Sequence, residues 1–167
     1  MRHAAEFQEF YEASYGRIVA VAAGLLGDRH EAEDVAQEAF SRAYVRWSTL
    51  GRYELPEAWV RRVALRIAID TGRRRTRTAG LLSRLSAERT APALEPGEGV
   101  RFTALGGALA ALPQREREVL ALHYLADMPV DAIARECGLP SGTVKTRLAA
   151  GRQHLEQELA QCPEAMA

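Results

Sequence analysis

The amino-acid sequence predicts an all-α protein of two small helical domains joined by a flexible linker. Apolar residues recur at three- and four-residue steps through most of the chain, and no stretch shows the alternation of a half-buried strand. Residues 86–100 break this period and are rich in Ala, Pro, Glu and Gly, as is typical of a linker. We therefore expect a first domain at 1–80, a linker at 81–101 and a second domain at 102–167. The 167 residues, of which 47% are hydrophobic, suffice for two small cores.

The first two expected helices each carry one apolar face. In the first helix this face consists of Phe7, Phe10, Tyr11, Ser14, Ile18, Ala22, Leu25 and Leu26. Gly27 follows as a helix-ending residue, and Asp28 and Glu31 then have the spacing of a capping box. The apolar face of the second helix consists of Ala32, Val35, Ala36, Ala39, Phe40, Ala43 and Trp47.

The opposite face of the second helix is polar and mainly acidic. It presents Glu31, Asp34, Glu38 and Ser41, with Gln37 and Arg42 at its margins. His30 and Glu31 begin a string like the HExxH of metalloproteases, but Asp34 stands where the second His would be. Since the first domain offers no other cluster of metal-ligating side chains, we expect no metal and interpret this face as a protein-binding surface.

A third helix is expected to begin at Pro56, which suits a first helical turn. Trp59, Val63 and Ile67 share its expected inner face. The side chains of Trp47 and Trp59 could stack on unpaired bases, but we expect both to lie in the core. The outer face carries Arg62, Arg66 and Arg73 at steps of four and seven, and the basic run continues through Arg74, Arg75 and Arg77. Cationic side chains also stabilise the C-terminal end of a helix through its dipole, which is the alternative interpretation. The clustering of the arginines at one end of one helix favours phosphate binding. We expect the helices to end near Arg77, with Leu81, Leu82 and Leu85 able to add a short helix.

The formal net charge of zero conceals an asymmetry along the chain. Residues 1–58 carry six arginines and ten acidic residues, whereas residues 59–89 carry nine arginines and two acidic residues. Residues 90–167 are again mildly acidic. An acidic section can meet a basic protein surface while a compact basic section meets phosphate, so the neutral total is compatible with nucleic-acid binding.

The second domain ends in a pattern typical of a helix-turn-helix, VDAIARECGLPSGTVKTRLAAGR at residues 130–152. Ala134 is small where two helices must approach, Gly138 can take a positive φ, and Val144 would join the second helix to the first. Ser141 is expected to cap the second helix. The apolar side of the motif is completed by Ile133, Cys137, Leu139 and Leu148. Further helices before the motif are indicated by Pro113 and by a series of apolar residues, Leu105, Leu109, Leu112, Val119, Leu122 and Leu125.

The outer face of the second helix of this motif is polar and cationic, with Thr143, Lys145, Thr146 and Arg147. Major-groove recognition helices place such side chains at their N-terminal end. A helical hairpin with a solvated basic face is the alternative interpretation. The rare spacing of a small residue, a glycine and an apolar residue favours DNA binding.

Other chemistry is not indicated. Cys137 and Cys162 lack the spacing of a disulfide framework or a metal site, so we expect reduced thiols. The longest apolar run, Ile18 to Leu26, is far short of the ~20 residues that span a bilayer, and no signal-peptide cleavage pattern is present. There is no glycine-rich phosphate loop and no nucleophile with a base. We therefore expect a cytoplasmic protein that is not an enzyme, with no cofactor, no small-molecule substrate and no membrane insertion.

Two motif blocks in this order closely resemble the extracytoplasmic-function (ECF) sigma factors of bacterial RNA polymerase. The first is GDRHEAEDVAQEAFSRAY with PEAWVRRVALRIAIDTGRRR, and the second is LPQREREVLALHYLADMPVDAIARECGLPSGTVKTRL. Together they cover nearly the whole chain. The resemblance implies two promoter-binding domains, conventionally two and four, and a polymerase subunit that directs transcription initiation. Its implied partners are core RNA polymerase, through the β′ clamp and the β subunit, promoter DNA and an anti-sigma factor.

The resemblance also implies three sets of site residues. The core-binding set is Asp34, Gln37, Glu38, Ser41 and Arg42. The segment from Ser48 to Pro56 and the helix from Trp59 to Arg75 match the part of the family that melts the −10 element and captures an extruded base. The arginines of this set are Arg61, Arg62, Arg66, Arg73, Arg74 and Arg75. The set that reads the −35 element is Ser141, Thr143, Lys145, Thr146, Arg147 and Arg152.

This chain departs from the family pattern at two places. Arg66 stands where the family commonly has Asn, and Ala149 and Ala150 stand where it commonly has His-Arg. The second change removes phosphate contacts, so we expect weaker anchoring at the −35 element. The short tail after the second motif block leads us to expect no appended regulatory domain. A regulator that binds DNA without joining polymerase is the alternative function, and an RNA-binding adaptor is a third.

Overall fold

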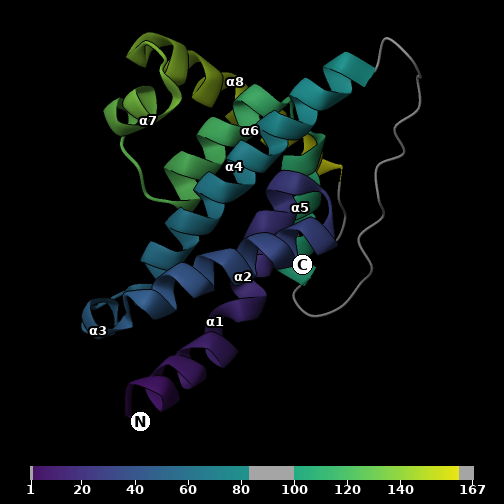
Figure 1. Cartoon of the computed structure of the whole chain (residues 1–167). Helices are drawn as coiled ribbons and strands as arrows, with labels where there is room; N and C mark the ends of the chain where they lie inside the picture. The colour runs from purple at the N-terminus through teal and green to yellow at the C-terminus, as the bar shows by residue number, and fades with distance from the viewer. Residues whose placement is uncertain (1, 83–99, 162–167) are drawn as a thin grey trace.

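The computed structural model describes residues 2–82 and 100–161, and every regular element within those two ranges is helical. The elements are α1 (Arg2–Leu26), α2 (Arg29–Val45), α3 (Trp47–Leu50), α4 (Pro56–Leu82), α5 (Val100–Ala111), α6 (Gln114–Leu120), a π-helical turn η1 (Ala121–Leu125), α7 (Val130–Cys137) and α8 (Ser141–Ala160). The all-α prediction is therefore confirmed (Figure 1). Leu81 and Leu82 continue α4, while Leu85, Cys162 and most of the expected linker lie outside the described residues.

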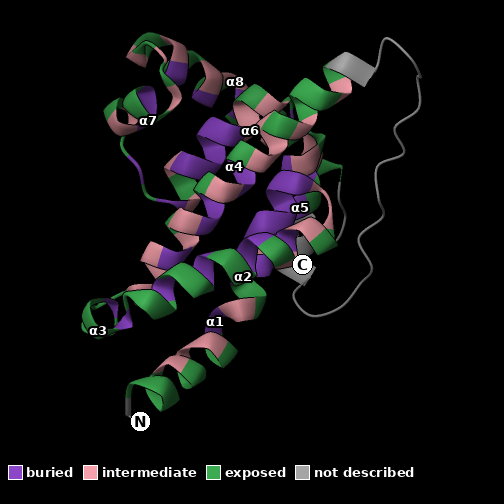
Figure 2. Ribbon diagram, viewed as in Figure 1, coloured by how far each residue is buried: buried purple, intermediate pink, exposed green. Residues whose placement is uncertain are grey.

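The first helical unit is a pair of helices, α1 and α2, closed by α4. Gly27 ends α1 with φ +66°, and the Asp28 carboxylate accepts a 3.0 Å hydrogen bond from the Glu31 N–H, which confirms both predicted boundaries. The predicted apolar face of α2 is buried from Ala32 to Ala43, and Trp47 on α3 is only 6% exposed. Figure 2 shows these buried faces turned toward one another.

The inner face of α4 differs from the prediction. Its fully buried positions are Val60, Ala64, Leu65, Ala68 and Ile69, whereas Trp59, Val63 and Ile67 are only partly buried. Small and β-branched residues at four-residue steps let α4 approach α1 and α2 closely, and the bulky Trp59 turns to the edge of that contact. The prediction of a core position is confirmed for Trp47, whereas Trp59 is only partly buried and packs against the edge of the core.

The second unit, α5 to α8, contains the predicted helix-turn-helix. Gly138 follows α7 with φ +63°, in the left-handed region, and Ile133, Val144 and Leu148 are buried between α7 and α8. Gly151 on α8 lies against Leu120 on α6 so closely that an added Cβ would come within 2.8 Å of Leu120 Cδ1. That close crossing fixes α8 on α6 and leaves its first turns free to face outward.

The two units pack against each other and share one continuous core. α5 lies along α1, where Gly24 and Gly106 meet: a Cβ built on Gly24 would lie 3.2 Å from the Cα of Gly106. On the other side, α4 of the first unit passes beside η1 of the second unit (Figure 1). The sequence predicted separate domains, and this packing is a finding of the tertiary structure.

Candidate nucleic-acid and protein interfaces

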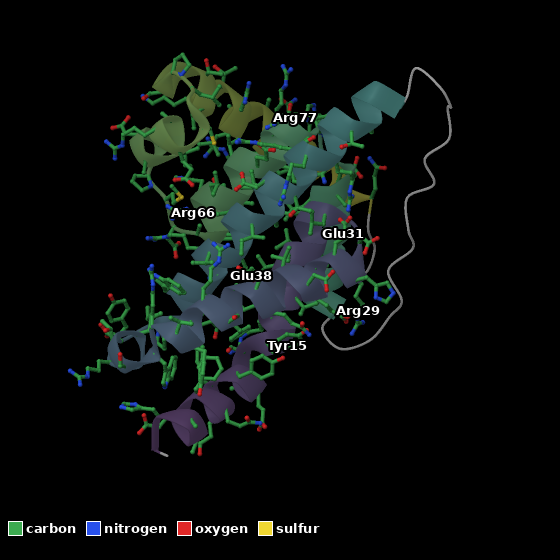
Figure 3. The ribbon with its side chains drawn as sticks, viewed as in Figure 1. Tyr15, Arg29, Glu31, Glu38, Arg66 and Arg77 are labelled. Carbon is green, nitrogen blue, oxygen red and sulfur yellow. The ribbon has the colours of Figure 1, made fainter. Side chains whose placement is uncertain are left out.

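The predicted protein-binding face of α2 lies on the outside of the molecule. Asp34, Gln37, Glu38, Ser41 and Arg42 are all exposed. Glu38 Oε1 accepts a 2.7 Å hydrogen bond from Arg42 Nε across one helical turn, and Figure 3 labels Glu38 on this face. Exposed pairs of this kind are weak and easily exchanged, so both charges remain available to a partner. Glu31 differs from this set, because its carboxylate contacts the Arg75 guanidinium.

Three of the six predicted reading residues of α8 are exposed to solvent, and the other three are half-buried. Lys145, Thr146 and Arg152 are exposed, and Thr143 and Arg147 are half-buried. The Arg152 guanidinium donates to the Tyr124 hydroxyl at 3.1 Å, which holds that side chain toward η1. The arrangement suits a helix that enters a groove by its first two turns.

The predicted capping role of Ser141 is wrong. Pro140 is the N-cap residue, with φ −62° and ψ 143°, and no side chain caps α8. The Ser141 hydroxyl instead donates to Asp131 Oδ1 of α7 at 3.0 Å. Proline has a fixed φ that suits the chain entering a helix, so the Pro–Ser order in the sequence was the signal for this shift.

A hollow of about 420 Å³ opens between the end of α2 and α4. Its lining joins apolar and cationic side chains, with Arg46 Cζ 5.9 Å from the centre of the Trp59 ring. The lining residues are Arg42, Val45, Arg46, Trp59, Val63 and Arg66. The sequence analysis did not assign Val45 and Arg46 to a site. Val45, an apolar residue on the polar side of α2 that is 81% exposed, was the signal that could have indicated them. An aromatic face beside several guanidinium groups is suited to an unstacked base and its phosphates.

Four arginines of the predicted −10 set are engaged by the second unit. Arg61 Nη1 and Arg62 Nη2 donate to the carbonyl oxygens of Leu125 and Ala126, at 3.4 and 3.1 Å. The Arg66 guanidinium holds Glu136 of α7 in a two-pronged pair, with Nε–Oε1 2.9 Å and Nη2–Oε2 3.2 Å. Figure 3 labels Arg66 on the side of α4 that faces α7.

Arg73 makes the most buried of these contacts. Its Nη2 lies 2.9 Å from Glu118 Oε2, and the Glu118 side chain is only 12% exposed. The hydrogen bond to this carboxylate raises the pKa of Arg73 above its already high usual value. Arg62 and Arg66 are exposed on the outer face of α4, as expected, and Arg73 is half-buried, while the guanidinium groups of all three also contact carboxylates or carbonyl oxygens of the second unit.

Arg74 and Arg75 make contacts within the first unit. Arg74 Nε donates to the Asp70 carbonyl oxygen of its own helix at 3.4 Å and remains exposed. Arg75 donates to the Leu26 carbonyl oxygen at 2.8 Å in addition to its contact with Glu31. Arg75 thus caps the end of α1, a structural role that a run of three arginines does not reveal from sequence.

The described residues contain neither a metal site nor a membrane-spanning helix. Among the described residues, no group of three or more His, Cys, Asp or Glu side chains is placed to hold a metal ion. Within the same residues, no helix is both long and apolar enough to cross a membrane.

Cys137 is a half-buried free thiol whose pKa is raised by burial, although the nearby Arg73 opposes this shift.

The fold and these surfaces define a two-unit helical protein with a helix-turn-helix and a second, arginine-rich surface. Comparison with known families refines this class. Residues 10–78 match Sigma-70 region 2, and residues 102–155 match Sigma-70, region 4.

Individual relatives agree with these two matches. The chain is 32% identical to the ECF RNA polymerase sigma factor SigW of Bacillus subtilis, over 81% of this chain and 79% of that protein. It is also 32% identical to the ECF RNA polymerase sigma factor SigL of Mycobacterium tuberculosis, over 74% of this chain and 72% of that protein. The fold is similar to that of the sigma factor RpoE of Bartonella quintana, solved with the anti-sigma factor NepR, with TM-score 0.61, 22% identity and coverage of 94% and 98% of the two chains.

The chain belongs to the ECF sigma factors of the sigma-70 family. It directs transcription initiation by RNA polymerase and is not an enzyme. The predicted family is confirmed, and the alternative of a regulator that never joins polymerase is set aside. The gap between the two family matches, residues 79–101, contains the stretch at 86–100 that is rich in Ala, Pro, Glu and Gly.

Proposed function

We propose that this sigma factor divides promoter recognition among three surfaces. The α2 face of Asp34, Gln37, Glu38, Ser41 and Arg42 docks on core polymerase. The arginines of α4 with the adjacent hollow open and read the −10 element, and the first turns of α8 read the duplex −35 element. The observation that carries this division is spatial: the exposed reading residues of α8 and the hollow on α4 belong to different helical units.

The chemistry of each surface supports its assignment. An acidic, solvent-exposed helix face is complementary to a basic clamp helix of the largest polymerase subunit. A hollow lined by Trp59 and three arginines suits one unpaired base flanked by phosphates. Lys145 and Arg147 on the first turns of α8 suit base edges and phosphates in a major groove.

Location and control follow from the same function. A factor that joins RNA polymerase works in the cytoplasm, where reduced cysteines such as Cys137 persist. The protein would be held inactive by an anti-sigma factor that covers one or more of the three surfaces. No small molecule is needed for any of the proposed contacts.

Transcription by purified core polymerase tests the proposal directly. Core enzyme with this protein should produce new transcripts from a genomic promoter library, whereas either component alone should not. If the protein alone gave sequence-specific footprints at nanomolar concentration and the mixture gave no new transcripts, the proposed division of labour would be wrong.

A further inference from the structure

We propose that Tyr124 and Arg152 together form a clamp for one phosphate of the DNA backbone beside the upstream promoter element. Arg152 belongs to the predicted reading set of α8, whereas Tyr124 lies on η1, outside the three proposed surfaces. The two side chains are joined by a hydrogen bond. This inference rests on the proposed function of α8 and adds to it a residue from another element.

Arg152 lies on the same side of α8 as Lys145, but further from the beginning of the helix. Seven residues complete almost two helical turns, so the two side chains point in nearly the same direction about 10.5 Å apart along the helix axis. Both are exposed. Recognition helices contact base edges with their N-terminal residues. When Lys145 reaches the base edges, Arg152 therefore lies nearer the sugar-phosphate backbone that borders the groove.

The stretch of α8 that leads to Arg152 offers no other hydrogen-bond donor among its side chains. The four residues that separate Arg147 from Arg152 are all apolar or glycine. Ala149 is exposed on the side of Lys145, but its methyl group cannot bind a phosphate. Contact with the backbone at this level therefore depends on Arg152 and on where its long side chain is held.

η1 holds the Tyr124 side chain beside Arg152. This π-helical turn belongs to a rare class that often lies at functional sites. The Tyr124 ring meets the His123 ring edge to face, with the ring centres 4.8 Å apart. His123 Nδ1 in turn lies 2.9 Å from the Met128 carbonyl oxygen, which can only accept, so the His ring is itself fixed. Tyr124 is thus held in place while 50% of its surface remains exposed.

The hydrogen bond between the two side chains leaves each of them able to donate again. Arg152 Nη1 donates to the Tyr124 hydroxyl oxygen at 3.1 Å, so the hydroxyl hydrogen points elsewhere. The guanidinium group has further N–H groups beside this one. One phosphate can accept from the hydroxyl and the guanidinium together, and the cation makes the hydroxyl a stronger donor. The pair therefore fits a group that only accepts hydrogen bonds, as a DNA phosphate does.

A methylphosphonate scan of the upstream element tests the clamp. A methylphosphonate replaces one charged phosphate oxygen by a methyl group, and so removes the charge and an acceptor at one known position. Holoenzyme made with the full-length protein binds duplex fragments of a promoter found in the genomic library, each with one methylphosphonate in the upstream element. Competition with the unmodified fragment measures relative affinity.

The scan compares wild type with Tyr124→Phe and Arg152→Ala. Tyr44→Phe and Arg115→Ala are the matched controls, because they change an exposed tyrosine on α2 and an exposed arginine on α6. Circular dichroism should show all four variants folded, since each of these side chains is half or more exposed or lies at the surface.

In wild type, a methylphosphonate at one position should weaken binding by roughly tenfold or more, as expected for hydrogen bonds to a charged group. At that position alone, the loss should be at least about threefold smaller in both clamp variants, because they make fewer contacts there. Arg152→Ala should also lower the slope of log affinity against log salt by about 0.9, whereas Tyr124→Phe removes no charge and should stay close to the wild-type slope. The controls should keep the wild-type pattern.

A wild-type pattern in either clamp variant would overturn the clamp, and so would changes at different phosphates in the two variants. Lys145→Ala keeps the two proposals apart. If Lys145→Ala binds like wild type and no upstream methylphosphonate weakens binding, it is the assignment of α8 to duplex DNA that fails. If Lys145→Ala is impaired while both clamp variants keep the wild-type pattern, only the clamp fails.

Discussion

Gly138 connects the two helices of the reading motif through a backbone conformation that other residues adopt with difficulty. Its φ is +63°, and a Cβ built there would meet nothing within 4 Å. The requirement for glycine is therefore conformational and not steric. Gly16 offers the opposite case, since it is helical, exposed and equally uncrowded.

Gly138→Ala should destabilise the protein by about 1 to 2 kcal/mol, because a left-handed conformation costs an L-residue about that much. Gly16→Ala should instead stabilise it by about 0.5 to 1 kcal/mol, since alanine loses less backbone entropy in a helix. Urea denaturation at constant m-value measures both changes. Equal shifts of the same sign in the two variants would contradict the role assigned to the Gly138 backbone.

The reading residues of α8 are the second test at this scale. In reconstituted holoenzyme, Lys145→Ala and Arg147→Ala should each weaken promoter binding by ~1 to 3 kcal/mol if the side chain contacts a base, and should relax preference at the upstream element. Arg115→Ala removes an exposed cation from α6, outside α8, and serves as the control. Competition binding with single-base variants of the −35 element measures the preference; a uniform loss over all sequences would indicate phosphate contact only.

At the scale of elements, α1 and α4 are held together by a two-pronged ion pair. Arg17 donates to the Glu57 carboxylate through Nε at 3.0 Å and Nη2 at 2.6 Å. These hydrogen bonds hold the pKa of Glu57 below its usual range. Because Glu57 is more acidic in the folded protein than in the unfolded chain, the pair stabilises the fold fully above the unfolded pKa of about 4.3. This stabilisation is lost as the pH falls through the lower, folded-state pKa.

Glu57→Gln should lower the free energy of unfolding at neutral pH by about 0.5 to 1 kcal/mol, a modest value because Arg17 is half exposed. The difference from wild type should shrink toward zero as the pH falls below about 4. Urea denaturation across this pH range gives the measurement. A difference that stayed constant down to the acid limit would show that the Glu57 charge is not its source.

The outer face of α2 is the second element with a testable role. Asp34→Ala with Glu38→Ala should weaken binding to core polymerase by about tenfold, in line with ~0.5 to 1 kcal/mol or more for each interfacial charge. The helical circular-dichroism signal should be unchanged, since both side chains are exposed. Glu9→Ala with Glu12→Ala removes the same charge from exposed positions on α1 and serves as control. If the two double variants titrate core polymerase alike, Asp34 and Glu38 lie outside the interface.

At the scale of the whole molecule, the proposed division between reading and opening predicts separable defects. In holoenzyme, Arg66→Ala should slow open-complex formation on duplex promoters and be largely rescued by a pre-melted bubble, because the strand then arrives unpaired. Lys145→Ala should remain impaired on both templates, because its duplex element is the same in each. Permanganate reactivity of unpaired thymines measures opening. Equal rescue of both variants by the bubble would show that duplex reading and strand opening are not divided between the two units.

The sequence by itself determined the helices, the helix-turn-helix with its glycine corner, the acidic face of α2 and the family. The family is indicated by the order of the two motif blocks. The helices, the glycine corner and the acidic face depend on residues within about one or two turns of each other, so periodicity and capping spacing predict them. The Asp28 cap, the positive φ at Gly27 and Gly138, and the buried faces of α1 and α2 are of this kind.

Only the tertiary structure decided what the arginine stripe of α4 meets. A row of arginines at helical spacing is equally compatible with phosphate, solvent or carboxylates, and the partners Glu118 and Glu136 lie 45 and 70 residues further along the chain. The same reason explains the edge position of Trp59, the pairing of Ser141 with Asp131 and the contact of Gly24 with Gly106. Each depends on which surfaces folding brings together, and no local pattern encodes the partner of a side chain across such a separation.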